Sequence, residues 1–271
     1  MSPGVIAALI TAIASLIAAP FTAVWAARSQ AQRTTEERRV GAKAELDRYR
    51  EPLLFAANEL GNRIHNIRNK EFLYYFGVPD YREHALLGTL FRFGQYFARL
   101  EMLYTNLSLM HFEKDKDTKA VAGLIRHIAG TFASDGLKPE ELSPTDRYVC
   151  FNRFMVWREE QRGIGEMMCE EHDGKPTSCI GYASFVNQYD KCYSKWFTLI
   201  AKDLESFAED LRSGVVDDSE RLRLLQGWLA KLVTQLDEEE AYKALNEKWI
   251  ARAEEPSERA KKRRAKIHMA P

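Results

Sequence analysis

The longest hydrophobic run lies at the N-terminus, where residues 5–27 contain no charged side chain. As a helix, this run extends about 34 Å, which is enough to cross the hydrocarbon core of a bilayer, about 30 Å thick. No lysine or arginine precedes it, whereas Arg28, Arg33 and Lys43 follow it. The positive-inside rule then places the N-terminus outside and the rest of the chain in the cytoplasm. The sequence therefore predicts one transmembrane helix in the inner (plasma) membrane.

Seven large apolar residues distributed along this run are the expected membrane anchor. They are Val5, Leu9, Ile13, Leu16, Ile17, Phe21 and Trp25. A cleaved signal peptide and a buried soluble helix are the alternatives, but the run lacks a basic start and is longer than a signal peptide requires. Gly4, Ala8 and Ala12 have the small-xxx-small spacing that lets two membrane helices approach, so homo-oligomerisation through this helix is a further hypothesis.

After a polar stretch at 28–43, apolar residues recur every three or four positions, which is typical of amphipathic helices. The expected helices cover residues 46–67, 86–107, 121–132, 143–167, 182–211 and 222–236, the last continuing or restarting through Trp249. Ser143 and Pro144 have the residue types of a helix start. No segment alternates convincingly with a period of two. We therefore expect an all-α fold in which about six helices form a bundle-like cytosolic domain.

Five regions follow from these patterns. They are a short extracytoplasmic N-terminus (1–4), the transmembrane helix (5–27), a polar juxtamembrane helix (28–43), the helical domain (44–255) and a disordered basic tail (256–271). With 45% hydrophobic and 29% charged residues in a chain of 271, the composition is that of a globular protein with a sizeable core.

The formal net charge is zero, but the C-terminal tail is strongly basic. Its cationic residues are Arg259, Lys261, Lys262, Arg263, Arg264 and Lys266. In a protein held at the inner leaflet, such a cluster favours contact with anionic lipid. Nucleic acid is a less favoured partner, and a solvated tail without a partner is the simplest alternative.

Motifs for catalysis are absent from the sequence. It has no glycine-rich phosphate loop, no His-Glu-x-x-His and no Gly-x-Ser-x-Gly. Cys169, His172, Cys179 and Cys192 are the best candidates for zinc ligands, but Cys192 is expected to lie several turns into the next helix, so we predict no metal and no cofactor. An Arg-x4-His pair of the kind found in HEPN ribonucleases occurs only at Arg263 and His268, in the tail. His65 is expected to be a hydrogen-bonded or partly exposed residue rather than a catalytic one.

Several motifs resemble those of a widespread group of uncharacterised bacterial proteins. They are Tyr49-Arg-Glu-Pro-Leu-Leu-Phe-Ala-Ala57, Arg63-Ile-His-Asn-Ile67, Gln161-Arg-Gly-Ile-Gly-Glu166 and Cys179-Ile-Gly-Tyr-Ala-Ser-Phe185. The resemblance covers most of residues 45–240. It implies a helical cytosolic domain behind an N-terminal membrane helix, and it implies no activity.

Taken together, these features predict a single-pass membrane protein whose helical domain is a non-enzymatic interaction or scaffold module. The lipid bilayer is its expected partner, and the sequence does not identify a protein partner. The alternatives are a membrane-held effector enzyme, such as a HEPN-like ribonuclease, and an oligomeric pore.

Overall fold

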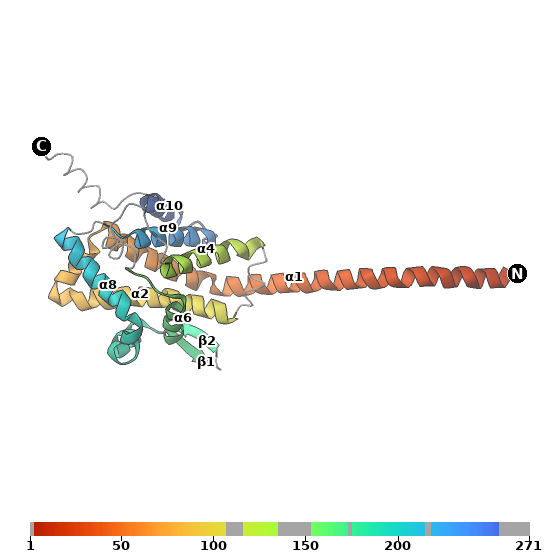
Figure 1. Ribbon diagram of the computed structural model, residues 1–271, viewed down its shortest axis with the longest axis horizontal. Helices are drawn as coiled ribbons and strands as arrows, with labels where there is room; N and C mark the ends of the chain where they lie inside the picture. The colour runs from red at the N-terminus through yellow and green to blue at the C-terminus, as the bar shows by residue number, and fades with distance from the viewer. Residues whose placement is uncertain (1–2, 107–115, 135–152, 173–174, 215–217, 255–271) are drawn as a thin grey trace.

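Helix α1 runs without a break from Pro3 to Asn69 and joins the N-terminal run to the folded part of the chain (Figure 1). The computed structural model describes residues 3–106, 116–134, 153–172, 175–214 and 218–254. Within α1, the side chains at positions 3, 5–24, 26, 38, 39, 42, 43, 45 and 46 are outside this description. The remaining elements are packed around the C-terminal third of α1.

Over the residues that the structure describes, no helix is long and apolar enough to cross a lipid bilayer. Trp25 is exposed on α1. The other expected anchor side chains lie outside the described residues: Val5, Leu9, Ile13, Leu16, Ile17 and Phe21.

The middle of α1 is a rod that projects from the domain (Figure 1). The side chains that are described between Ala27 and Arg48 are mostly exposed, and Tyr49 is the first buried one. At 1.5 Å per residue, this rod is about 30 Å long. The helix passes through Pro52, although proline cannot donate the backbone hydrogen bond of that turn. Proline is common in the first turn of a helix, but α1 does not start at Pro52.

Five helices build most of the domain around α1. They are α2 (Pro79–Asn106), α4 (Lys116–Ala133), α6 (Arg158–Met167), α9 (Glu220–Leu236) and α10 (Lys243–Glu254). Helix α1 contacts both α2 and α9, while α4 and α10 also contact α9, and α6 contacts α2 (Figure 1). Helix α9 ends at Leu236 and a new helix, α10, starts at Lys243, so the restart alternative is confirmed.

The hydrophobic stripes read from the sequence form the core. In α1, α2, α4 and α9 the residues at the expected three- and four-residue steps are almost fully buried: Leu53, Leu60, Ile64, Leu90, Phe93, Phe97, Ile125, Ile128, Phe132, Leu222, Leu225, Leu229 and Leu232. The prediction of a mainly helical domain is therefore confirmed. Leu245 of α10 is an exception, because it is exposed.

The expected helix at 182–211 is divided by a π-helical turn. It consists of α7 (Tyr182–Gln188), the turn η2 (Tyr189–Tyr193) and α8 (Ser194–Ser213). A short 3₁₀ helix, η1 (Phe72–Gly77), connects α1 to α2. Tyr74 and Tyr75 of η1 are exposed, whereas Phe76 is buried, so only part of the aromatic cluster around this connection enters the core.

The expected all-α bundle is confirmed in its helices, but the domain also contains a short β-hairpin that the sequence pattern did not predict. Strands β1 (Cys169–His172) and β2 (Lys175–Cys179) pair antiparallel, with Cys169 opposite Cys179 and His172 opposite Lys175. Both strands are rich in polar residues. Because apolar and polar residues do not alternate along them, the sequence pattern did not predict a strand here. The useful signal was the Asp173-Gly174 dipeptide, which favours two-residue hairpin turns.

The predicted helix from Ser143 to Met167 is shorter than expected. Its first part lies outside the described residues, and positions 153–157 are not helical. Phe154 has a positive φ of 60°, a conformation that L-residues rarely adopt, and its side chain is fully buried. Its backbone N–H donates to the Asp203 carboxylate of α8 at 2.6 Å, and Arg153 pairs with Asp210. These contacts hold the segment against α8 in a non-helical form.

Two glycines let α6 approach its neighbours closely. A Cβ at Gly165 would stand 2.8 Å from the Phe97 carbonyl oxygen of α2, and one at Gly163 would stand 2.4 Å from the Trp196 ring of α8. Neither distance leaves room for a methyl group. Glycine lowers helix propensity, but here the two glycines allow close packing of α6 on α2 and α8.

Candidate functional site

A cleft of about 300 Å³ lies between α2, α4 and α6, and it is the best candidate for a binding site in the described part of the chain. Its apolar wall comes from Phe97, Leu100, Leu103, Ala122, Ile125 and Ala129. Its polar residues are Glu101, Tyr104, Arg126, Arg158, Gln161 and Arg162. An apolar wall with a few convergent polar groups is typical of small-molecule sites, and this volume is at the small end of their range.

The two arginines of α6 share one face of that helix. Arg158 and Arg162 are four residues apart, so they lie on successive turns and both reach the cleft. Arg158 extends over α4, because its Nη2 atom lies 3.7 Å from where a Cβ of Gly130 would stand. Arg126 of α4 lines the cleft as well. Guanidinium groups from two helices thus converge on one opening.

The Glu101 carboxylate of α2 fixes one of these arginines. Arg162 donates to it through both Nε and Nη2, with the Nη2–Oε1 distance at 2.7 Å, and this two-point contact is the strongest arrangement for such a pair. The Thr105 hydroxyl donates to the same carboxylate at 3.1 Å. The hydrogen bonds from Arg162 to Glu101 raise the pKa of Arg162, so it remains charged. Arg162 therefore has a fixed position on the wall of the cleft.

Tyr104 contributes a polar group from the same face of α2. The guanidinium carbon of Arg162 lies 5.5 Å from the centre of its ring, a distance typical of a cation–π contact. Burial raises the pKa of Tyr104, so its hydroxyl stays protonated at neutral pH and can donate a hydrogen bond. The cleft thus offers hydrogen-bond donors of two kinds.

The charges that line the cleft are unequal. Among the lining residues that the structure describes, three are arginines and one is a glutamate. Such an arrangement attracts anions, and arginine is well suited to carboxylate and phosphate oxygens because its donors form a planar fork. The chemistry available here is therefore anion binding beside an apolar surface.

Sequence reasoning missed this cleft. Glu159 and Glu160 lie beside its arginines in the sequence, but neither is among the lining residues. Glu160 instead accepts a hydrogen bond from the Trp157 backbone N–H at 3.0 Å, at the start of α6. The available signal was the i, i+4 spacing of Arg158 and Arg162, but only the fold brings α4 and Glu101 to them.

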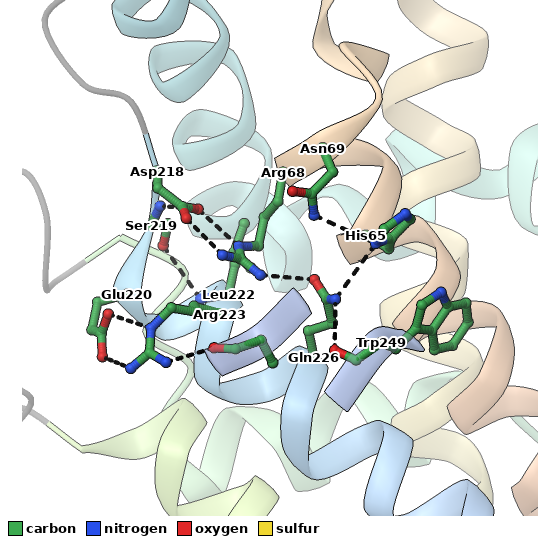
Figure 2. A network of polar contacts seen from close by, with 11 residues as sticks. His65, Arg68, Asn69, Asp218, Ser219, Glu220, Leu222, Arg223, Gln226 and Trp249 are labelled. Carbon is green, nitrogen blue, oxygen red and sulfur yellow. Dashed lines mark hydrogen bonds and ion pairs between the residues drawn. The ribbon is translucent and has the colours of Figure 1, made fainter. Parts of the chain in front are cut away.

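A second polar cluster lies where α1 meets α9 and α10 (Figure 2). Arg68 is 1% exposed and donates to both carboxylate oxygens of Asp218, at 2.8 and 2.6 Å. It also donates to the Gln226 side-chain oxygen at 2.9 Å. The Gln226 amide then donates to the Trp249 carbonyl at 3.2 Å. This network connects three helices and is structural in character.

His65, a candidate from the sequence, belongs to this network and is buried (Figure 2). Its Nδ1 atom lies 3.5 Å from the Gln226 amide nitrogen and 3.4 Å from the Asn69 amide nitrogen. Because Arg68 donates to the Gln226 oxygen, the Gln226 nitrogen must face His65, which assigns Nδ1 as an acceptor. Burial, reinforced by nearby cations including Lys70 and Arg68, lowers the pKa of His65 to about 4.

This low pKa predicts that stability decreases in mild acid. The unfolded chain binds a proton at His65 near pH 6.5, whereas the folded protein does so only near pH 4. The free energy of unfolding is therefore not reduced by this residue above pH 6.5. It decreases progressively as the pH falls from 6.5 to 4, by at most about 3 kcal/mol. Urea unfolding of His65→Leu should show a smaller loss between pH 7 and pH 4.5 than the unsubstituted protein. His84→Leu, which removes an exposed histidine, should keep the full loss, and equal losses in both variants would contradict the assignment.

The expected zinc candidates do not converge. Cys169 and Cys179 are free cysteines that lie opposite each other across the hairpin. The Cys169 thiol contacts the Ala98 carbonyl oxygen at 3.7 Å. Cys192 lies on η2, with its sulfur 4.0 Å from the Gln188 side chain. Over the described ranges, no group of three or more histidine, cysteine, aspartate or glutamate residues is placed to hold a metal. Burial raises the pKa of Cys169 to about 12, which is typical of an unreactive thiol.

The C-terminal candidates are outside the described residues. This applies to the basic tail cluster and to the Arg263–His268 pair. The tail cluster comprises Arg259, Lys261, Lys262, Arg263, Arg264 and Lys266.

Comparison with protein-family models, with curated proteins and with solved structures finds no match to this chain. The argument for the cleft therefore depends on its own geometry and charge. It is the described feature in which charged groups from three helices meet beside an apolar wall.

Proposed function

We propose that this chain is a single-pass membrane-anchored binding module. In this proposal, residues 5–27 cross the inner membrane with the N-terminus outside, and the helical domain lies in the cytoplasm and binds an anionic group in the cleft between α2, α4 and α6. The observation that carries the proposal is the convergence of Arg126, Arg158 and the Glu101-fixed Arg162 beside an apolar wall. The module is proposed to be non-enzymatic.

The anchor follows from the sequence, and the course of α1 is compatible with it. Residues 5–27 contain no charged side chain and are followed by Arg28, Arg33, Arg38 and Arg39. The backbone continues from this run into the core as one helix. The rod between Ala27 and Tyr49 would hold the domain about 30 Å from the bilayer. In this arrangement the cleft faces the cytoplasm rather than the lipid headgroups.

A binding role fits the residues of the cleft better than catalysis does. The carboxylate of Glu101 is engaged by Arg162 and Thr105, so it is poorly placed to accept a proton from a substrate. The described lining contains no histidine, cysteine, serine or lysine to act as base or nucleophile. Three guanidinium groups hold and orient an anion without transferring a proton, because arginine stays charged.

The anchor proposal predicts where the protein is found after cell lysis. Full-length protein should sediment with membranes and resist extraction by high salt. Replacing Ile13 and Leu16 with lysine places two charges in the apolar run, each of which costs about 3 kcal/mol at the bilayer centre, and should move most of the protein to the soluble fraction. The test is ultracentrifugation followed by immunoblotting of both fractions.

Matched substitutions in the rod provide the control. Ala31→Lys with Val40→Lys adds the same charge at two exposed positions of α1, and this variant should stay with the membranes. If full-length, unprocessed protein without substitutions were found in the soluble fraction, the anchor would be excluded. Contact of the basic tail with anionic lipid stays a separate prediction.

A further inference from the structure

We infer that a group of exposed tyrosines, at the end of the domain away from the rod, is a docking surface for the tail cluster of the same chain. This surface, the tyrosine face, consists of Glu71, Tyr74 and Tyr75 around η1 and of Asp80 and Tyr81 in the first turn of α2. The inference goes beyond the proposed function, because it does not involve the cleft. Three features carry it: the aromatic rings, the carboxylates beside them, and the place where α10 ends.

The three tyrosines form a contiguous aromatic surface. Tyr74, Tyr75 and Tyr81 are 68%, 45% and 56% exposed. The centre of the Tyr75 ring lies 6.4 Å from that of Tyr74 and 5.8 Å from that of Tyr81. Exposed apolar groups that gather in one place are typical of interaction surfaces. Tyrosine rings attract lysine and arginine through cation–π contacts, and among the described residues such contacts use other rings, as where Arg63 lies over Phe72.

The carboxylates of the face have no ion-pair partner among the described residues. Glu71 directly precedes η1, and Asp80 directly precedes Tyr81. Both side chains are exposed, and neither takes part in an ion pair or a side-chain hydrogen bond. A lysine or arginine placed over the tyrosines would therefore also meet a carboxylate that is not already engaged.

A groove of about 150 Å³ adjoins the face between η1 and α8. Glu71, Leu73, Tyr74 and Leu211 line it. Arg212 lines it as well, but this arginine pairs with Glu209 of its own helix. Lysine and arginine can lay their apolar stems along such a surface while their charged ends reach a carboxylate. The groove therefore suits one long cationic side chain.

Helix α10 ends on the same side of the domain as the tyrosine face. The chain through α10 runs in the same direction as α1, because Glu238 pairs with Arg50 and the Trp249 ring stacks on His65 with 6.0 Å between centres. Helix α1 ends at Asn69, one turn after His65, and η1 follows it directly. The residues that follow α10 therefore leave the domain at the end where the tyrosines lie.

The length of chain after α10 favours the face over the bilayer. Arg259 and Lys266 lie 5 and 12 positions after Glu254, so an extended chain would carry them at most about 17 and 42 Å from the end of α10. In the proposed anchored arrangement, α1 from Ala27 to His65 would keep this end of the domain about 57 Å from the bilayer. The tail cluster would then reach the tyrosine face but not the inner leaflet. Docking on the face and contact with lipid are therefore alternatives.

The test is zero-length cross-linking of the full-length protein in neutral detergent with a water-soluble carbodiimide. This reagent joins a lysine amine to a carboxylate only where the two groups touch. The coupled residues are identified by peptide mass spectrometry of the monomer. The expected products join Lys261, Lys262 or Lys266 to Glu71 or Asp80. The exposed Lys243–Glu240 pair, at 2.9 and 3.0 Å, is the internal standard, because its coupling shows that the reagent has acted.

Two variants assign the contact to the aromatic rings. Replacing Tyr74, Tyr75 and Tyr81 together with serine removes the rings and no charge, and it should lower the yield of these products about fivefold or more. Phe55→Ser is the control, because Phe55 is an exposed aromatic residue of α1 outside the face, and the yield should be unchanged. Thermal unfolding of each variant verifies that it is folded.

Every other outcome contradicts the inference. If Lys243 and Glu240 are coupled but no tail lysine joins the face, or if the triple tyrosine variant is coupled as the parent is, the face is not the docking surface. If the products occur only in cross-linked dimers, the occupant is a second copy. If the products are lost in vesicles that contain phosphatidylserine but kept in neutral vesicles, the tail cluster binds lipid instead. None of these results bears on the cleft, so its proposed role is tested separately.

Discussion

Replacing Arg221 with methionine is expected to lower the free energy of unfolding by about 4 kcal/mol. Arg221 is fully buried at the start of α9. It donates to the carbonyl oxygens of Arg153, Phe132 and Ser134, at 3.0, 3.0 and 2.8 Å, and also to that of Thr131. Methionine keeps most of the volume but leaves these carbonyl oxygens without the guanidinium that they contact.

The physical reason is that Arg221 connects three parts of the chain. The carbonyls at the end of α4 have no partner inside their own helix, and a cation there also interacts favourably with the helix dipole. Burial lowers the pKa of Arg221 to about 10, so the side chain remains charged at neutral pH. Removing it therefore disconnects the end of α4 and the segment before α6 from α9.

Urea unfolding followed by circular dichroism measures this loss. The transition midpoint should fall without a change in the slope of the transition, as expected when only stability changes. Arg212→Met is the control, since Arg212 lies at the surface of α8 and pairs with Glu209 three residues away, and its loss should cost less than about 1 kcal/mol. An equally small loss for Arg221→Met would show that the buried guanidinium contributes little.

The second large effect is expected at Arg68, whose replacement by methionine should cost about 3 to 5 kcal/mol. The guanidinium contacts both oxygens of Asp218 and the side chain of Gln226 in the buried network of Figure 2. Removing one partner of a buried pair leaves the other charge poorly compensated, and this is why breaking such a pair costs more than the pair contributes.

A double-mutant cycle with Asp218→Asn tests that explanation. If the cost comes from the remaining carboxylate, the double variant should be less destabilised than the sum of the single variants, by at least about 1 kcal/mol. The exposed pair Arg82–Glu205 is the matched comparison and should show coupling of less than about 1 kcal/mol. Additive effects at Arg68 and Asp218 would mean that their contact is not energetically important.

The helices of this protein could be predicted from its sequence because their signal is local. Residues such as Leu53, Phe93, Ile125 and Leu229 follow the 3.6-residue period, and every one of them is buried. The periodicity therefore identified the elements and the side that each one turns to the core. The hairpin was missed because its polar strands carry no such period.

The cleft could not be predicted in this way, because its parts are far apart in the sequence. Glu101 and Arg162 are separated by 61 positions and meet only because α6 packs closely against α2. That approach depends on Gly165, whose missing side chain lets the Phe97 backbone come near. Glycine lowers helix propensity, and only the packing of two helices reveals the contribution of this glycine to the site.

Helix α1 is both the projecting rod and a central element of the core, with no loop between the two parts. A flexible linker would absorb a pull or a twist applied at the N-terminus, but a continuous helix transmits it to Leu53, Leu60 and Ile64, which are buried in the domain. Mechanical load on the N-terminus would thus act first on the contacts of α1 with α2 and α9. The domain would resist such a load only as strongly as those contacts hold, whatever the strength of the attachment at the other end of the rod.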